Sequence, residues 1–362
     1  MQQLIESLNL VMSESPLSQN LLHWFHQYGR KHLPWQQDQN PYRVWVSEIM
    51  LQQTQVNTVI PYFEKFMDSF PTVADLAQAE EDKVLHHWTG LGYYARARNL
   101  HKTARLIHTE HKDIFPKSVD ELSELPGIGR STAGAILSLG YKERAVILDG
   151  NVKRVLCRYH CIEGWPDQTQ TQKRLWEVAE QHTPQKDCAH YTQAIMDLGA
   201  SLCSRNKPAC GLCPLNESCE AYLTNRTDEF PHKKPKKTIP VKSTYMLIFH
   251  NSAEQKVLLE KRPPQGIWGG LWSFPEKDDI SDFDDLLSNQ IMGDQQSTKQ
   301  CPPIRHTFSH YHLDITPVII SLEKSNQSIM ENTHWHWYDL AEPQELGLAA
   351  PVKKLLGMLT EL

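Results

Sequence analysis

The chain of 362 residues contains no apolar run close to the roughly 20 residues that a membrane-spanning helix needs. Its N-terminus also lacks the basic and then apolar pattern of a secretory signal. The sequence therefore predicts a cytoplasmic protein with no membrane partner. Eight cysteines would permit disulfides in a secreted protein, but without such a signal they indicate metal ligands or free thiols.

An excess of positive charge is also missing. The chain has 37 Lys and Arg against 43 Asp and Glu, so its net charge of −6 is unfavourable for binding a polyanion. Residues 226–242 are an exception, since they hold several prolines and 6 basic against 2 acidic side chains, and they predict a basic linker. Any contact with nucleic acid must therefore depend on local basic patches.

The segment around which the chain is organised reads LPGIGRSTAGAILSLGYKERAVILDGNVKR and spans residues 125–154. Gly127 and Gly129 permit a sharp turn that lies close to another molecule. A helix predicted over 131–139 would then point unpaired backbone N–H groups outward, which suits a phosphate. Such a turn by itself is more often simple punctuation between helices.

The second half of this segment is an apolar run that stops at Asp149, just before a helix predicted over 152–158. Asp149 could be only an N-cap, the commonest reason for Asp before a helix. The two roles are compatible, because capping N–H bonds would hold the carboxylate ionised and an ionised carboxylate can stabilise a developing cation.

Together these motifs resemble the helix-hairpin-helix and catalytic Asp of the DNA glycosylase superfamily, and most closely the adenine DNA glycosylases of the MutY kind. The resemblance implies a mainly α catalytic region in two lobes over residues 1–225, with the DNA between the lobes. It further implies a basic, Pro-rich linker over 226–242 and an α+β Nudix-like domain over 243–362.

A second apolar-faced helix is predicted over residues 42–56 and carries Glu48. Burial among apolar neighbours would raise the pKa of this carboxyl and make it a proton donor near neutrality, although an exposed or paired Glu would show the same spacing. By resemblance, Glu48 protonates adenine N7 and helps to activate water, while Asp149 stabilises the oxocarbenium ion. Asn151 is expected to position these groups.

Residues 89–105, TGLGYYARARNLHKTAR, interleave tyrosines with basic side chains. This is a moderate signal for nucleic-acid binding, and a solvated basic helix with core tyrosines explains the spacing equally well. By resemblance, Gln53 and Tyr93 fill or wedge the duplex where the target base is unstacked. The other DNA contacts expected from the hairpin are Gly127, Gly129 and Ser131.

The strongest chemical signal is four cysteines in the pattern C-x6-C-x2-C-x5-C, which could hold zinc or an iron–sulfur cluster. The spacing resembles the motif of the endonuclease III and MutY branches, and so implies one [4Fe–4S] cluster and no catalytic metal. Arg205 and Lys207, between the first two ligands, are candidate phosphate contacts. The expected ligands are Cys203, Cys210, Cys213 and Cys219.

The C-terminal part begins with strands predicted over 243–249 and 256–260, followed by PPQGIWGGLWSFPE, which resembles the start of a Nudix-like domain. The acidic segment after it lacks the Arg-Glu-x-x-Glu-Glu box that a hydrolytic Nudix enzyme needs for magnesium. The domain is therefore expected to recognise rather than hydrolyse. Its segment RHTFSHYHLDI resembles the family loop that inspects 8-oxoguanine, with Phe308, Ser309 and His310 as the matching residues.

The chain departs from the family pattern at two positions, and each departure changes what we expect of the protein. Ser131 stands where endonuclease III-like enzymes carry a lysine nucleophile, and a hydroxyl cannot form the Schiff base that drives strand cleavage. We therefore expect a monofunctional glycosylase, although Lys153, near Asp149 in sequence, could trap an abasic site incidentally. Gln36 stands where some relatives have Arg, so any contact through that Arg is not expected here.

The sequence thus predicts a monomeric base-excision-repair enzyme of a bacterial-type cytosol and nucleoid, acting on double-stranded DNA that contains adenine opposite 8-oxoguanine or guanine. Three alternatives remain. An endonuclease III-like lyase acting on oxidised pyrimidines would want the missing lysine, and a Nudix nucleotide hydrolase would need the missing carboxylate box. The third is a non-enzymatic helix-hairpin-helix DNA-binding module. Such a protein has no catalytic activity, so Glu48→Gln and Asp149→Asn would change none.

Overall fold

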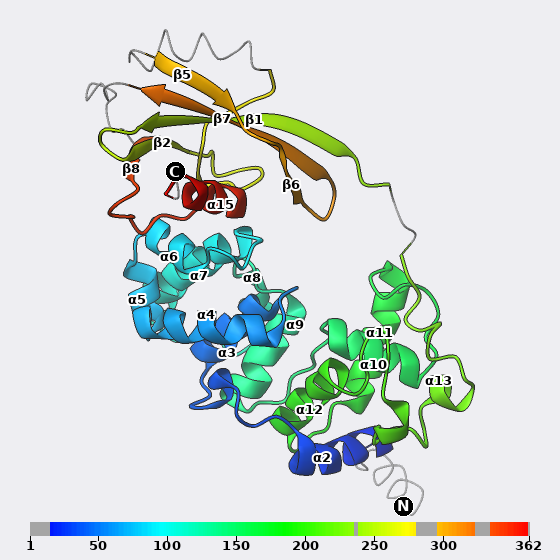
Figure 1. Ribbon diagram of the computed structural model, residues 1–362. Coiled ribbons are helices and arrows are strands. Elements are labelled where there is room, and N and C mark those ends of the chain that lie inside the picture. The colour runs from blue at the N-terminus through cyan, green and yellow to red at the C-terminus, as the bar shows by residue number, and fades with distance from the viewer. Residues whose placement is uncertain (1–14, 235–237, 280–294, 323–333, 361–362) are drawn as a thin grey trace, which may run out of the picture. The chain divides into compact units, whose positions relative to one another are not determined.

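The computed structural model describes residues 15–234, 238–279, 295–322 and 334–360 (Figure 1). Residues 280–294, which include most of the acidic segment discussed above, lie outside them. The chain forms two compact units, and the division does not follow the sequence simply. Gln78–His101 group with the C-terminal residues, whereas the first unit consists of the chain before and after this segment up to residue 235. Within the described ranges, no helix is long and apolar enough to cross a membrane.

The first unit is helical and has two lobes. One lobe is centred on α3, whose indole of Trp45 is fully buried against Phe115 at 5.4 Å between ring centroids. Its elements are α3 (Pro41–Leu51), α4 (Val56–Ser69), α5 (Val73–Gln78), the C-terminal part of α7 (Ala95–His111), α8 (Val119–Glu124), α9 (Arg130–Ala135), the 3-10 turn η1 (Pro34–Gln36) and the π-helical turn η2 (Ile136–Tyr141).

The other lobe encloses a second core, built from Leu21 on α2, Leu156 on α10, Leu175 on α11 and Leu198 on α12. Each of these side chains is fully buried, as the apolar stripe of a surface helix predicts. The elements are α2 (Pro16–Tyr28), α10 (Gly150–Tyr159), α11 (Thr169–His182), α12 (Cys188–Ala200), η3 (Cys210–Leu212) and α13 (Glu220–Leu223).

Helix α3 begins as its sequence suggests, because Pro41 follows Asn40 and the Asn40 side chain accepts a hydrogen bond from the Arg43 N–H. The prediction that it continues to residue 56 was wrong, since it ends at Leu51. Residues 52–55 are polar and offer no apolar side chain to a buried stripe. They form a turn in which Gln53 adopts a left-handed conformation with φ 58°.

The hairpin between α8 and α9 is confirmed as a sharp turn, but only one glycine uses its conformational freedom. Gly127 has φ 80°, whereas Gly129 has φ −92° and serves as the N-cap of α9. The helix expected over 131–139 is divided into α9 and the π-helical turn η2, which ends at Lys142 with φ 61°. A π-helical turn of this kind is rare and is frequent near functional sites.

The residues leading to Asp149 pack directly on α9. A Cβ atom at Gly134 would lie 2.1 Å from the carbonyl oxygen of Val146, so only glycine permits this approach. Nearby, the Ser131 hydroxyl accepts a hydrogen bond of 2.9 Å from the Leu148 N–H. The hairpin helix therefore fixes the position from which α10 starts.

The second unit contains an eight-stranded sheet in which β1 and β7 run parallel and the other pairs run antiparallel. Leu247, Phe249 and Ile320 form the centre of its core. The strand order is β3-β2-β1-β7-β5, with β4 on β1, β6 on β7 and β8 on β2. The strands and the last helix are β1 (Val241–Asn251), β2 (Lys256–Lys261), β3 (Trp272–Ser273), β4 (Glu276–Lys277), β5 (Gln295–Gln300), β6 (Ile304–Thr307), β7 (His312–Leu322), β8 (Trp335–Asp339) and α15 (Ala350–Leu359).

Residues 78–101, with α6 (Glu81–His87) and the start of α7, pack against this sheet domain. The Lys261 ammonium lies 2.9 Å from the Asp82 carboxylate, and the Tyr94 hydroxyl donates a 2.9 Å hydrogen bond to the Leu348 carbonyl. Tyr94 is therefore a buried core tyrosine and offers no free face for stacking. Tyr93, in contrast, is 51% exposed.

Both ends of the segment 226–242 belong to ordered structure. Phe230 is buried, and its carbonyl accepts a 2.9 Å hydrogen bond from Arg158 Nε on α10. At the other end, β1 already begins at Val241. Among the described residues between these ends, Lys233 and Lys234 are exposed.

We expect Gly134→Ala to lower the free energy of unfolding by about 1–3 kcal/mol, because the added methyl group must displace backbone. Thermal unfolding followed by circular dichroism measures the effect. Gly150→Ala is the matched control, since no atom lies within 4 Å of a Cβ at that position. Equal melting temperatures for the two variants would contradict the close approach of α9 and Val146.

Candidate active site

The first unit contains a cavity of about 960 Å³ that brings together residues from five separated stretches of the chain. Glu48 enters from α3, Gln53 from the turn after it, Ser131 from α9, and Asp149 and Asn151 from the start of α10. Its volume suits a small organic group such as a nucleobase with part of its sugar. Other side chains that line it are Arg30, Leu33, Trp35, Arg154, Gln193 and Met196.

Asp149 is the N-cap of α10, as predicted. Its Oδ1 accepts hydrogen bonds from the N–H groups of Asn151 (3.1 Å) and Val152 (2.8 Å). Its Oδ2 accepts a further bond of 3.1 Å from the Asn151 side-chain amide. The helix terminus thus orients the carboxylate and supplies partial positive charge to it.

Glu48 lacks such support, because no residue in the described ranges donates a hydrogen bond to its carboxyl group. Glu48 is half-buried and lines the cavity. Desolvation, together with the negative charge of Asp149, raises the pKa of Glu48 to about 8. This direction is the one that the sequence predicted for Glu48, and its role as a proton donor stays a prediction.

Opposing influences act on the pKa of Asp149. Burial raises the pKa of Asp149 above its ordinary value, although bonds from Val152 and Asn151 and the charge of Arg154 lower it. The two carboxyl groups therefore compete for one proton. Donors surround Asp149 and none in the described ranges reaches Glu48, so the surroundings favour the proton on Glu48 and the charge on Asp149.

Arg154 is a residue of the site that the sequence did not single out. Its guanidinium donates hydrogen bonds to the Asn151 side-chain oxygen (2.8 Å) and to the carbonyls of Gly199 (2.6 Å) and Cys203 (2.8 Å). It therefore connects the Asp149–Asn151 pair to α12 and to the first predicted metal ligand. Its position one helical turn after Asn151 was the available signal.

The four cysteines of the predicted metal site are all free thiols, and their electrostatic interactions show that they are neighbours. Burial raises the pKa of Cys213 to about 12, and the nearby sulfurs of Cys203, Cys219 and Cys210 add to this rise. Arg158 donates a 3.3 Å hydrogen bond to the Cys203 sulfur. Four mutually repelling thiolates need a metal centre to compensate their charge, so the donor set fits one.

Comparisons with known proteins agree with this arrangement. The model of the HhH-GPD superfamily of base excision DNA repair proteins matches residues 46–181, and a NUDIX domain model matches residues 244–358. An adenine DNA glycosylase of Buchnera aphidicola subsp. Acyrthosiphon pisum is 41% identical over 345 residues, which is 95% of this chain and 98% of that protein. The chain belongs to the adenine DNA glycosylase family.

More distant relatives support the same assignment. The Homo sapiens adenine DNA glycosylase is 34% identical over 308 residues, covering 71% of this chain and 56% of that protein. A solved thermostable thymine-DNA glycosylase has a TM-score of 0.53 and 25% identity, and covers 57% of this chain and 95% of that chain. These matches confirm the expected helical glycosylase fold, the Nudix-like domain and a monofunctional glycosylase of base excision repair.

The second unit of this glycosylase carries the predicted recognition residues at one tip of the sheet. Ser309 and His310 are exposed in the four-residue turn between β6 and β7, closed by a 2.9 Å bond from the Phe308 N–H to the Tyr311 carbonyl. The Phe308 ring packs 5.2 Å from Trp268 between centroids, inside an aromatic cluster. Phe308 is half-buried in this cluster, whereas Ser309 and His310 are exposed, and the role of all three in recognition stays a prediction.

The other predicted DNA contacts of the glycosylase are mostly accessible. Gly127 and Gly129 are exposed on the hairpin, and Arg205 and Lys207 are exposed between the cysteines. In the second unit, Tyr93 has φ 51°. Ser131 differs from these, because it faces the cavity while its hydroxyl accepts the bond from Leu148.

Lys153 forms an ion pair and does not line the cavity. Its ammonium lies 2.6 Å from the Asp167 carboxylate, and it is not among the residues that line the cavity. The neighbouring Arg154 faces the cavity instead. Incidental trapping of an abasic site by Lys153 would first require this ion pair to open.

We expect the base-excision rate constant to stay constant as pH rises towards 8 and to fall about tenfold per unit above it. The acid form of Glu48 exists below its pKa of about 8 and disappears above it. Single-turnover excision from pH 6 to 9.5, with DNA binding measured alongside, gives the profile. A rate that is independent of pH up to 9.5 would show that Glu48 is not the acid.

We expect Arg154→Gln to reduce the single-turnover rate by about 10²-fold while DNA affinity changes only a few-fold, because Asn151 and Asp149 lose their support. Loss of the Arg154 charge also raises the pKa of Asp149, so protonation of Asp149 should slow the variant at a higher pH than it slows the original protein, in which the rate is level near neutrality. Arg154→Lys keeps the charge and should recover part of the rate. Unchanged rates with equal metal content would contradict the positioning role.

Proposed function

We propose that the protein removes adenine paired with 8-oxoguanine or guanine in double-stranded DNA and leaves an abasic site. The observation that carries this proposal is that one cavity holds both Glu48, whose pKa is raised to about 8, and Asp149, whose carboxylate accepts three hydrogen bonds. Breaking a purine–sugar bond requires these two groups, one as proton donor and the other beside the sugar cation.

In this mechanism, Glu48 donates its proton to N7 of the adenine. The bond between the sugar C1′ and N9 then breaks, and its electron pair leaves with the neutral base. Asp149 stabilises the positive charge that develops on the sugar, and Asn151 keeps the Asp149 carboxylate in place through its amide. Water adds to C1′ and its proton goes to the Glu48 carboxylate, which restores the acid.

The monofunctional outcome follows from the residues around this site. None of the described residues that line the cavity is a lysine, so no amine is present to attack C1′ and form a Schiff base. Ser131, at the position of the lyase lysine, uses its hydroxyl to hold the Leu148 N–H. The product would therefore be an abasic site in an unbroken strand.

We assign one [4Fe–4S] cluster to the four cysteines named above, as a resident group that supplies cross-linking rather than catalysis. The loop between its first two ligands would present Arg205 and Lys207 to DNA phosphates. Arg154 and Arg158, both bonded to the Cys203 carbonyl, connect this loop to α10. The cluster would thus support both DNA binding and the position of Asp149.

In the second unit, Ser309 and His310 would hydrogen-bond the 8-oxoguanine opposite the target, since both are exposed and polar. Gln53 and Tyr93 would fill the duplex where adenine is unstacked, at a cost of a few kcal/mol that is smallest at a mismatch. Both have left-handed backbones, which turns their side chains out of the regular helices. We further propose that the enzyme acts as a monomer in the cytoplasm on chromosomal DNA.

The direct test uses duplexes with adenine opposite 8-oxoguanine, guanine or thymine, with half of each sample treated with hot alkali. We expect strand breaks only after alkali, and only opposite 8-oxoguanine and guanine. Glu48→Gln and Asp149→Asn should each reduce the rate by at least 10²-fold because each removes one charge or proton from the transition state. Their DNA affinity, measured by fluorescence anisotropy, should remain close to that of the original protein.

Two outcomes would overturn this proposal. Breaks without alkali at comparable rates would indicate a lyase and contradict the argument from Ser131. DNA binding without any breaks, in protein with a full complement of iron, would indicate a binding module. Ser309→Ala tests the recognition turn separately, since it should reduce the preference for 8-oxoguanine over guanine without lowering the rate opposite guanine.

A further inference from the structure

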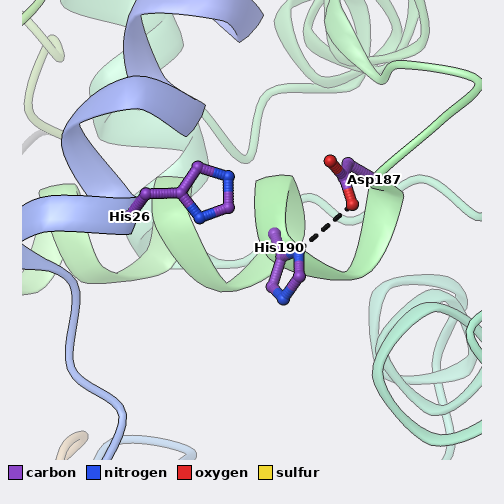
Figure 2. Close-up of side chains that lie close together, drawn as sticks. All are labelled: His26, Asp187 and His190. Carbon is purple, nitrogen blue, oxygen red and sulfur yellow. Dashed lines mark hydrogen bonds and ion pairs between the residues drawn. The ribbon is translucent and has the colours of Figure 1, made fainter.

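Three metal-ligating side chains meet on the surface of the second lobe, apart from the cysteines and the two catalytic carboxyl groups. His26 comes from the last turn of α2, and Asp187 and His190 come from the start of α12 (Figure 2). One ligand atom from each lies within 4.8 Å of the others, and all three residues are exposed. The rings of His26 and His190 are 5.4 Å apart between centroids and 70° from parallel.

The Asp187 carboxylate pairs with His190 and does not cap helix α12. It occupies the N-cap position of α12, where an Asp side chain normally accepts a backbone N–H bond, yet it makes no such bond here. Its backbone is left-handed, with φ 57°, and its Oδ1 lies 3.2 Å from Nδ1 of His190. The carboxylate therefore contacts the imidazole of His190, three residues later, instead of capping the helix.

We propose that His26, Asp187 and His190 bind a divalent transition metal ion, with zinc as the best fit, and that this site joins α2 to α12. Two imidazoles and one carboxylate are a donor set that zinc accepts, with water in the remaining position. Zinc with bonds of about 2.0–2.1 Å holds its ligand atoms roughly 3.3 Å apart. Asp187 and His190 already have this separation, and rotation of the exposed His26 side chain closes the rest.

The donor set, with two imidazoles and one carboxylate, favours an imidazole-binding metal over magnesium or calcium. The cavity beside it, of about 460 Å³, is also lined by Arg30, Lys31 and Lys142. Each of these cations is engaged: Arg30 pairs with Asp197, and Lys31 and Lys142 each donate to a backbone carbonyl at 2.6 Å. With one carboxylate and three cations nearby, a hard ion that needs several oxygen ligands finds too few of them.

A metal ion here would brace one wall of the catalytic cavity. Helix α12 contributes Gln193 and Met196 to that wall, and Arg30, two residues beyond α2, also lines it. Arg30 and α12 are already joined by the ion pair between Arg30 and the buried Asp197, at 2.6 Å. The proposed ion adds a second connection between the same two elements, and ligand binding to the folded state raises its stability.

The test uses the full chain without a histidine tag and with its iron content measured before and after each titration. Isothermal titration calorimetry with zinc chloride should show one saturable site of micromolar affinity, and the melting temperature should rise by several degrees at saturation. His26→Asn and His190→Asn should each weaken zinc binding at least tenfold, and the double variant should remove it. Magnesium chloride should give no saturable signal.

His23→Asn is the matched control, because His23 lies one turn earlier on α2 and hydrogen-bonds Gln27 instead of joining the group. It should bind zinc within twofold of the original chain. Unchanged zinc affinity in the double variant would overturn the proposal, as would absence of a saturable site. Zinc uptake that is matched by loss of iron would also overturn it, since the ion would then be entering the cysteine site.

Discussion

The catalytic centre depends on the way Asp149 caps helix α10. Two backbone N–H groups and the Asn151 amide fix both carboxylate oxygens. These bonds favour the ionised form of Asp149, whereas desolvation and the charge of Asp149 raise the pKa of Glu48. A single helix terminus thus gives two neighbouring carboxyl groups different surroundings, as the proposed mechanism requires.

The surrounding elements preserve that terminus from several directions. Gly134 lets the segment before Asp149 approach α9, and Ser131 holds the Leu148 N–H. From the other side, Arg154 connects Asn151 to the Gly199 and Cys203 carbonyls, and therefore to the cysteine loop. The cysteine loop and the Asp149 carboxylate are in this way parts of one hydrogen-bonded structure, although they are separate motifs in the sequence.

The departures from expectation have a common physical origin. Helix α3 stops at Leu51 because the next four residues are polar. Tyr94 is buried, and its hydroxyl donates a hydrogen bond to the Leu348 carbonyl of the second unit. Periodicity alone cannot distinguish a tyrosine that stacks on a ligand from one that packs in a core. In the same way, the rise in the pKa of Asp149 depends on how much protein surrounds it, which local capping bonds do not reveal.

The sequence by itself determined the family, the order of its parts, the capping role of Asp149 and the cysteine set. These features rest on local interactions, in which a few neighbouring residues fix the backbone and expose or pair a side chain. Only the tertiary structure decided which distant residues meet: Glu48 with Asp149, Arg154 with the cysteine loop, and His26 with Asp187 and His190. Such meetings depend on how whole helices pack, and helix packing is set by long-range burial rather than by the residues nearest in the chain.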